Sequence, residues 1–206
     1  MIFFSLCIIV YMNDDDLIQK AGTLYLKSQK LLSTFDFLNI AKKYFGKASQ
    51  VGSAATNLML DADIDIDCQV EKIDKSVILK FVDKLLSFKE CKKVILYNHI
   101  LDEKACFIVN VEKFNFEGEK WIITFHISKN LEDPTNFINW IKENLTEEKR
   151  KTILMFKKYR EENKQKRTIP SHLIYKAVIE GNVENVENFK KYLSENGIDP
   201  EKKDNE

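Results

Sequence analysis

The most chemically suggestive pattern in this sequence is a run in which aspartates alternate with isoleucines, Asp63-Ile64-Asp65-Ile66-Asp67. Alternation with a period of two predicts a β-strand, because successive side chains of a strand point to opposite faces. The aspartates therefore share one polar face, and carboxylate oxygens are the ligands that Mg²⁺ prefers. Two such ions, roughly 4 Å apart, activate an attacking hydroxyl and stabilise a leaving pyrophosphate. We accordingly predict that Asp63, Asp65 and Asp67 bind metal for chemistry on phosphates.

A Gly-Ser pair stands upstream of this strand, separated from it by residues 54–62. Gly52 permits the backbone to approach a ligand closely, and Ser53 offers a hydroxyl group. The residues that follow, 54–58, are predicted to form a short helix whose free N–H groups and dipole favour a triphosphate. Gly52 and Ser53 are therefore candidate phosphate contacts beside the metal ligands.

The elements that must position these residues predict an α+β fold, in which a small mixed β-sheet core is flanked by helices and followed by a C-terminal helical section. Apolar residues recur at helical spacing in 14–46, where two helices are expected, and in 74–90, where Asp74 is a candidate N-cap. A hairpin turn is expected at 117–119. The predicted strands are 63–70, 93–99, 106–116 and 120–128, and the later helices are about 134–145, 146–166, 171–180 and 183–195.

We divide the chain into three regions on this basis. Residues 1–35 form an N-terminal segment and helix, residues 36–130 form the core, and residues 131–206 form the C-terminal helical section. The metal and phosphate candidates all fall in the core.

The Gly-Ser turn and the acidic strand together resemble the motif of the DNA polymerase beta-like nucleotidyltransferase superfamily, in the form of its prokaryotic, stand-alone domains. That motif is a hydrophobic residue, Gly, Gly or Ser, a gap of about this length, and then Asp-hydrophobic-Asp-hydrophobic. It reads here Val-Gly-Ser at 51–53 and Asp-Ile-Asp-Ile at 63–66. The resemblance covers about residues 36–130, and the superfamily fold is a short mixed sheet packed by helices.

The resemblance implies a role for each matched residue. Gly52 and Ser53 contact the phosphates of a nucleoside triphosphate. Asp63 and Asp65 bind divalent metal, with two Mg²⁺ ions expected.

Active members of the superfamily usually carry a third acidic residue on a later strand, where it helps to bind metal. The polar face of the strand 120–128 carries Thr124, His126 and Ser128, and it has no carboxylate. Two acids elsewhere are alternatives. Asp67 shares the face of the other aspartates but lies about 7 Å further along the strand.

Glu112 is the second alternative, and it reaches the site only in one hairpin register. A three-residue loop pairs Glu112 with Thr124, whereas a two-residue loop pairs it with Ile123 and mixes polar with apolar faces. Keeping polar residues opposite polar residues favours the three-residue loop, which also places Asn110 opposite His126. Glu112 is therefore a candidate catalytic residue with the first two aspartates.

We interpret the role of each histidine from the residues near it in the sequence. His126 is a candidate general base or, with Thr124, a candidate phosphate or nucleotide contact. The alternative is that His126 is simply a polar residue on an exposed strand face. His99 and His172 have no acidic or Cys/His partner nearby in the sequence, and we interpret both as structural.

Residues 149–167 carry a surplus of lysine and arginine. One interpretation is an electropositive wall that faces the active cleft and binds the triphosphate or a nucleic-acid acceptor. The interpretation that we favour is a solvated helix face, because no recognised nucleic-acid module is present.

The overall composition predicts a cytoplasmic protein with no membrane partner. Lys+Arg and Asp+Glu each number 32 among 206 residues, so no global field attracts nucleic acid or membrane. The apolar run 1–11 is too short to span a bilayer and lacks the features of a signal peptide. It either precedes a true start at Met12 or adds an edge strand. The cysteines lack metal-binding spacing and are interpreted as reduced thiols: Cys7, Cys68, Cys91 and Cys106.

These observations predict a metal-dependent nucleotidyltransferase. It transfers a nucleoside monophosphate from an NTP such as ATP to a hydroxyl acceptor and releases pyrophosphate. The acceptor is a small molecule, a protein or an RNA end, and neither its identity nor the oligomeric state follows from the sequence. The alternative is a catalytically degenerate module of the same fold that binds nucleotide or serves as an antitoxin-like partner.

Overall fold

A computed structural model of the chain describes residues 14–101, 106–129, 131 and 133–204. Its centre is a five-stranded sheet in the order β1-β2-β5-β4-β3. The sheet is mixed, because β2 runs parallel to β5 and antiparallel to β1. The predicted fold class is therefore confirmed. The strands are β1 (Lys47–Val51), β2 (Asp63–Gln69), β3 (Lys93–His99), β4 (Cys106–Phe116) and β5 (Glu119–Ser128).

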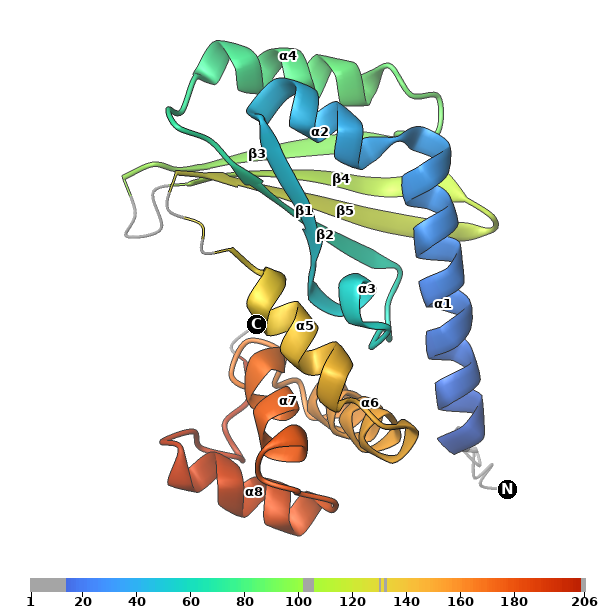
Figure 1. The fold of residues 1–206 in the computed structure, drawn as a ribbon, viewed down its shortest axis with the longest axis vertical. Helices are drawn as coiled ribbons and strands as arrows, with labels where there is room; N and C mark the ends of the chain where they lie inside the picture. The colour runs from blue at the N-terminus through green and yellow to red at the C-terminus, as the bar shows by residue number, and fades with distance from the viewer. Residues whose placement is uncertain (1–13, 102–105, 130, 132, 205–206) are drawn as a thin grey trace, which may run out of the picture.

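The helices fall on two sides of this sheet (Figure 1). α2 and α4 cover one face, while α3 and the later helices lie on the other side. The predicted strands and helices are all present, and the structure adds β1, which was not among the predicted strands. The helices are α1 (Asp14–Phe35), α2 (Phe37–Phe45), α3 (Gly52–Thr56), α4 (Lys75–Leu86), α5 (Thr135–Asn144), α6 (Glu147–Glu162), α7 (Ser171–Ile179) and α8 (Val186–Glu195).

The predicted N-cap of α4 is confirmed. The Asp74 carboxylate accepts hydrogen bonds from the backbone N–H of Ser76 at 2.8 Å and of Val77 at 3.4 Å. These bonds satisfy two of the N–H groups that a helix start leaves without intrahelical partners. The predicted start or edge strand at residues 1–12 lies outside the described residues.

The alternation of β2 divides the sheet into an apolar and a polar face. Ile64, Ile66 and Cys68 are fully buried, and they pack in one core with the rings of α2 and α4. Within that core Phe81 meets Phe125 edge to face, with ring centroids 4.9 Å apart. The aspartates of β2 therefore point away from the core, as the sequence predicted.

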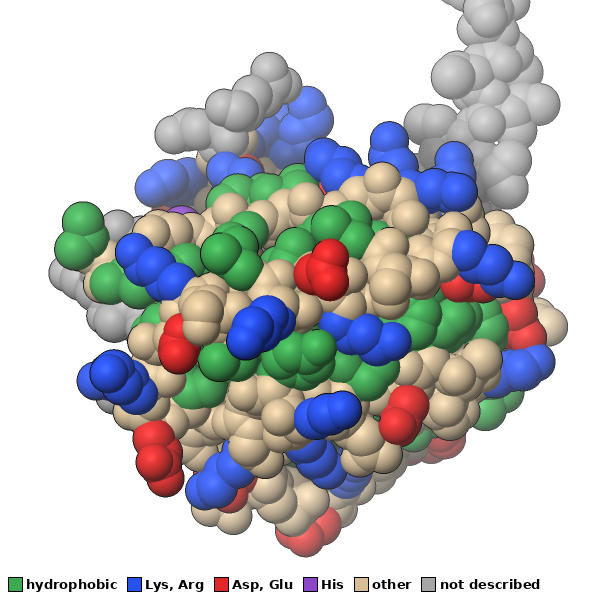
Figure 2. Space-filling view, turned by 90° about the horizontal axis from the view of Figure 1, so that it is seen from above, with side chains coloured by type: hydrophobic (Ala, Val, Ile, Leu, Met, Phe, Trp, Pro, Cys, Tyr) green, Lys and Arg blue, Asp and Glu red, His purple; other side chains and the backbone are tan. Residues whose placement is uncertain are grey.

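The outer surface of α2 and α4 is mixed in character. Figure 2 views the molecule from the side of α4 and shows lysines and arginines interspersed with hydrophobic side chains. On α4, Leu79 is 59% exposed and Leu86 is 54% exposed. Isolated exposed leucines of this kind are common on protein surfaces.

The β4–β5 hairpin differs from the prediction, and the difference moves Glu112. The turn has two residues, Glu117 and Gly118, both with positive φ, and Phe116 pairs with Glu119. A β-bulge between Val111 and Phe114 then shifts the register by one residue. The predicted three-residue loop is therefore wrong.

The bulge decides which residues of β4 face β5. Asn110 pairs with Thr124, and Ile108 pairs with His126, so Glu112 does not lie opposite Thr124. The Glu112 carboxylate instead forms an ion pair with Lys93 of β3 at 2.8 Å. The register on which a catalytic role for Glu112 depended is contradicted. The observed register differs from the predicted one by two residues, so Asn110 faces a polar residue of β5 in both, and matching polar with polar residues could not distinguish them.

A second core joins the C-terminal helices. It contains Phe156 of α6 stacked on Phe189 of α8 at 4.4 Å, together with Leu58 from the loop after α3. A third cluster packs Leu17 of α1 against Leu154 of α6. α1 thus contacts both the sheet core and the C-terminal helices, as its course in Figure 1 shows.

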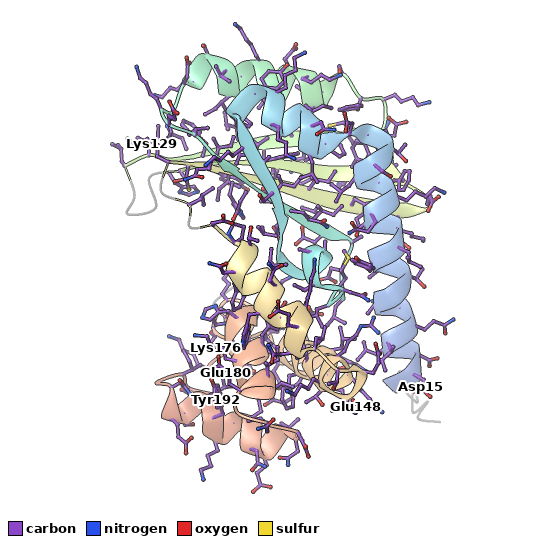
Figure 3. The ribbon with its side chains drawn as sticks, in the orientation of Figure 1. Asp15, Lys129, Glu148, Lys176, Glu180 and Tyr192 are labelled. Carbon is purple, nitrogen blue, oxygen red and sulfur yellow. The ribbon has the colours of Figure 1, made fainter. Side chains whose placement is uncertain are left out.

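The turn between α7 and α8 requires a glycine. A Cβ atom on Gly181 would lie 2.7 Å from the carbonyl oxygen of Ala177 and 3.4 Å from a ring carbon of Tyr192. Figure 3 shows Lys176, Glu180 and Tyr192 gathered at this junction of the two helices. The short turn lets α8 pack back on α7 and close the second core.

Candidate active site

A pocket of about 340 Å³ lies where the start of β2 meets the C-terminal helices. It brings together Gly52, Ser53, Asp63 and Asp65, which the sequence singled out. The core supplies these four, and α5, α6 and α7 supply much of the opposite wall. The remaining lining residues are Leu60, Asp61, Phe137, Lys157, Arg160, Glu161, Lys166, Ser171, His172 and Tyr175.

Gly52 stands against Asp65 because of the β1–β2 register. Val51, the last residue of β1, pairs with Asp65, and Gly52 follows with φ +67°. A Cβ atom at Gly52 would lie 2.6 Å from Oδ2 of Asp65. Only glycine fits this backbone conformation and this close approach together. The Gly-Ser motif and the aspartate motif thus form one structural unit.

Asp63 and Asp65 are held in a poorly solvated environment. Burial, together with the charge of Asp65, raises the pKa of Asp63 to about 6. Burial also raises the pKa of Asp65, and the nearby His126 partly offsets that shift. Oδ1 of Asp63 is buried and accepts no hydrogen bond from the described residues. Ionising a carboxyl group with such an oxygen costs free energy unless a cation binds it.

These features fit a divalent cation. The pair offers hard carboxylate oxygens, one of them without a partner, beside a glycine that leaves room for a ligand. Within the described part of the chain, no group of three or more His, Cys, Asp or Glu residues is placed to hold a metal ion. The predicted pair of Mg²⁺ ions stays a prediction.

Asp67 and His126 form a separate pair further along the same sheet face. Asp67 is opposite His126 in the parallel β2–β5 register, and its Oδ1 lies 3.2 Å from Nδ1 of His126. Asp67 does not line the pocket of Asp63 and Asp65. Its carboxylate is thus engaged with the histidine, and its predicted role as a metal ligand stays a prediction.

The position expected for a third acid is occupied by polar, uncharged side chains. Thr124 is opposite Asp65 on β5, and Asn110 of β4 is opposite Thr124. Oδ1 of Asn110 is buried and accepts no hydrogen bond from the described residues. The row across the three strands therefore reads aspartate, threonine, asparagine.

The basic segment is neither a simple solvated face nor a simple phosphate wall. Arg150 of α6 donates from Nε to the Asn57 carbonyl oxygen at 3.1 Å and from Nη2 to Oδ1 of the same residue at 3.2 Å. Lys157 is buried and donates to the Leu58 carbonyl oxygen. The solvated interpretation is wrong for these two side chains. They hold the loop that follows α3 and leads to β2, and α3 itself begins with the Gly-Ser turn.

Lys157 also lines the pocket, together with Arg160 and Lys166 of the same segment. Arg160 donates from Nη1 to the Ile169 carbonyl oxygen at 3.1 Å and to Oγ of Ser171 at 3.0 Å. Lys166 reaches across from the α6–α7 turn, and its Nζ lies 3.2 Å from Oδ2 of Asp61. Burial lowers the pKa of Lys157 to about 8. The α6 side thus brings positive charge to a pocket whose other side is acidic.

The sequence did not identify several of the residues that line the pocket. His172, interpreted as structural, lines the pocket at the start of α7. Phe137 of α5 also lines it, with its ring stacked on Trp140 at a centroid distance of 5.5 Å. Helix packing alone brings these residues to the aspartates, so no local motif could have identified them. His99 lies on β3, stacked on Tyr97.

The comparisons with known proteins rest on structure. No family model matches the chain, and no curated protein matches it. A cytoplasmic RNA terminal U-transferase superposes with a TM-score of 0.53 at 14% identity, covering 81% of this chain and 54% of that chain. A Cid1 poly(U) polymerase bound to MgATP gives 0.56 at 13% identity, covering 80% and 54%. The GLD-2 poly(A) polymerase in complex with GLD-3 gives 0.51 at 14% identity, covering 79% and 57%.

These likenesses show the fold. The neighbours are an RNA terminal U-transferase, a poly(U) polymerase and a poly(A) polymerase, and this chain shares with them the fold of a mixed sheet with flanking helices. The chain spans about half the length of each of them. The narrower expectation of a prokaryotic, stand-alone domain stays a prediction. None of the helices in the described residues is long and apolar enough to cross a membrane.

Proposed function

We propose that this protein binds a nucleoside triphosphate with a divalent cation in the Asp63–Asp65 pocket and transfers its nucleoside monophosphate to a hydroxyl acceptor. The observation that carries the proposal is the contact of Gly52 with Asp65 beside the unpartnered oxygen of Asp63. The fold shared with nucleotidyltransferases supports it.

In this proposal each side of the pocket has its own task. Asp63 and Asp65 hold Mg²⁺, which when bound supplies positive charge to the phosphates. Gly52 and Ser53 contact the phosphates from the core side, and Lys166 contacts them from the α6–α7 turn. The pocket mixes both signs of charge, as a metal–triphosphate complex requires.

The reaction forms a bond between the acceptor oxygen and the α-phosphorus. The bond from that phosphorus to the oxygen bridging the α- and β-phosphates breaks, and pyrophosphate leaves. In the proposal, His126 takes the proton of the acceptor hydroxyl, because it lies on the same polar sheet face and its charge acts on Asp65. Asp67, hydrogen-bonded to Nδ1, orients its ring. Thr124 lies opposite Asp65 and two residues before His126 on the same face of β5, where it is proposed to contact the nucleotide.

A specific observation favours a second candidate function. Thr124 and Asn110 stand where an acidic residue is expected, and the described residues hold no three-ligand metal cluster. A module that binds a nucleotide without transferring it fits this arrangement. The two candidates share the pocket and differ only in turnover.

The test uses labelled NTPs with Mg²⁺ and three classes of acceptor, namely RNA oligonucleotides, hydroxylated small molecules and proteins. We expect labelled product and pyrophosphate with the wild type and neither with Asp63→Asn/Asp65→Asn. Asp83→Asn, on the exposed side of α4, is the matched control and should behave as the wild type. Nucleotide binding by the wild type without product from any acceptor would favour the binding module. Equal nucleotide binding and equal product formation in the wild type and the double variant would refute both candidates.

A further inference from the structure

A segment distant in sequence holds the α6–α7 turn in place. Residues 199–204, which we name the strap, lie against residues 163–170, the α6–α7 turn. The Asp204 carboxylate accepts hydrogen bonds from the backbone N–H of Arg167 at 2.7 Å and of Thr168 at 2.8 Å. It also accepts one from Oγ1 of Thr168 at 2.9 Å. One carboxylate thus fixes two consecutive peptide units of the turn.

Groups of the α6–α7 turn also form hydrogen bonds with the backbone of the strap. Gln165 is only 1% exposed, and its Nε2 donates to the carbonyl oxygens of Pro200 at 2.6 Å and Lys202 at 3.1 Å. The backbone N–H of Asp204 donates to the carbonyl oxygen of Lys164 at 2.7 Å. The contact is therefore reciprocal and includes a buried side chain.

The turn needs this support because it is irregular. Lys164 has φ +54°, a left-handed conformation that is unfavourable for a residue with a side chain. The N–H groups of Arg167 and Thr168 obtain their partner from the strap. Without the strap, these groups would be left to water, and the turn would lose its fixed conformation.

Lys166 sits between the residues that the strap fixes. Its side chain extends from the turn to Asp61 on the loop before β2, at 3.2 Å, and it lines the pocket of Asp63 and Asp65. The positive charge of Lys166 counters the raised pKa values of both aspartates. The strap thus acts on a cation that faces the candidate nucleotide site.

We propose that the strap positions Lys166 for binding the phosphates of the nucleotide, with Asp204 as the positioning residue. This inference rests on the proposed function, since it assigns the strap to the same pocket. The reasoning is one of preorganisation, because a cation on an already ordered turn loses less conformational entropy when it meets a phosphate. Asp204 itself does not line the pocket.

The test measures the affinity of the full chain for inorganic tripolyphosphate with Mg²⁺ by calorimetry. We expect Lys166→Ala and Asp204→Ala each to weaken binding roughly tenfold, as loss of one charge-assisted hydrogen bond would. The double variant should bind no more weakly than either single variant, because both changes remove the same contact. Glu195→Ala removes an exposed carboxylate at the end of α8 and should bind as the wild type.

Backbone amide hydrogen exchange supplies a second readout that needs no ligand. Asp204→Ala should accelerate exchange in residues 164–169 while exchange in the β-sheet stays unchanged. Asp204→Asn keeps one acceptor oxygen and should give a smaller effect in both assays, so it serves if the alanine variant fails to fold.

The outcomes separate the two proposals. Wild-type affinity in Asp204→Ala, or losses that multiply in the double variant, would overturn the role of the strap while leaving the proposed function intact. Failure of the wild type to bind either tripolyphosphate or any NTP would overturn the proposed function itself, and with it the assignment of Lys166 to phosphate.

Discussion

Two sets of buried charges lie within the same part of this molecule, and they are satisfied in opposite ways. The cations Arg150 and Lys157 of α6 donate to carbonyl oxygens of the loop after α3. The carboxylates Asp63 and Asp65 of β2 have raised pKa values, and one Asp63 oxygen has no partner in the described residues. The cations therefore help to complete the fold, whereas this Asp63 oxygen is available to the metal ion that we propose.

This contrast offers a criterion for distinguishing charged side chains that stabilise the fold from those that bind a ligand. A buried ion whose donors are all met by the protein stabilises one conformation, and its loss leaves carbonyl groups unsatisfied. A buried ion without a partner costs stability unless function retains it. The sign of the stability change on neutralisation is thus the distinguishing measurement.

The largest expected effect is on the acidic side. Asp63→Asn/Asp65→Asn should lower nucleotidyl transfer by about a thousandfold or more, because the metal loses its protein ligands. The same variant without ligand should be more stable than the wild type at pH 7, by roughly 1–3 kcal/mol, since the buried charges are removed. Product formation and denaturant unfolding measure the two effects. A double variant less stable than the wild type would contradict the distinction between functional aspartates and structural cations.

The next effect is on the basic side and has the opposite sign. Arg150→Ala should destabilise the protein by roughly 2 kcal/mol, because the carbonyl and side-chain oxygens of Asn57 lose their donors. Lys158→Ala is the matched control, since within the described part of the chain this lysine makes an i,i+4 pair with Glu162 at 3.8 Å and no other ion pair. The control should change stability by less than about 0.5 kcal/mol. Equal losses in urea unfolding would show that α6 contributes only general charge.

The acidic site should also respond to pH. Its folded-state pKa of about 6 exceeds the ordinary value of 3.8 for Asp63, so the folded protein holds this proton more tightly than the unfolded chain. The associated stability is present below pH 3.8 and is lost as the pH rises through 6. Mg²⁺ binding requires the ionised form of Asp63, so the affinity for Mg²⁺ should weaken about tenfold per pH unit as the pH falls below about 6.

Thermal melting with and without Mg²⁺ at pH 5, 6 and 7 checks this dependence. The Asp63→Asn variant serves as the control and should lose most of it. A Mg²⁺-induced shift in melting temperature that is as large at pH 5 as at pH 7 would contradict the assignment of Asp63 as a ligand.

The smallest expected effect is a difference in stability between alanine substitutions at two glycines with positive φ. Gly52→Ala adds both backbone strain and a contact with Asp65, whereas Gly46→Ala adds strain alone, because nothing lies within 4 Å of its Cβ position. We expect Gly52→Ala to be less stable than Gly46→Ala by roughly 1 kcal/mol. Only Gly52→Ala should also weaken nucleotide binding. Denaturant unfolding and calorimetry of both variants check the pair.

Local sequence patterns determined much of this fold. The alternation in 63–67 fixes which side chains of β2 enter the core, because strand geometry repeats every two residues. Helical periodicity placed the helices, and Asp74 marked the start of α4 because a cap acts within three residues. Gly52 and Ser53 were also identifiable, since their distance from the aspartates is a sequence property.

Tertiary structure decided everything that depends on partners distant in the chain. A bulge at Glu112 replaced the predicted register and put Asn110 opposite Thr124, because pairing across a hairpin depends on both strands together. Packing of α5–α8 against the core brought His172 and Lys166 to the pocket. The surplus of basic residues was visible in the sequence. Only the fold showed that Arg150 binds a carbonyl oxygen outside the pocket, whereas Lys157 and Arg160 bind carbonyl oxygens and also line it.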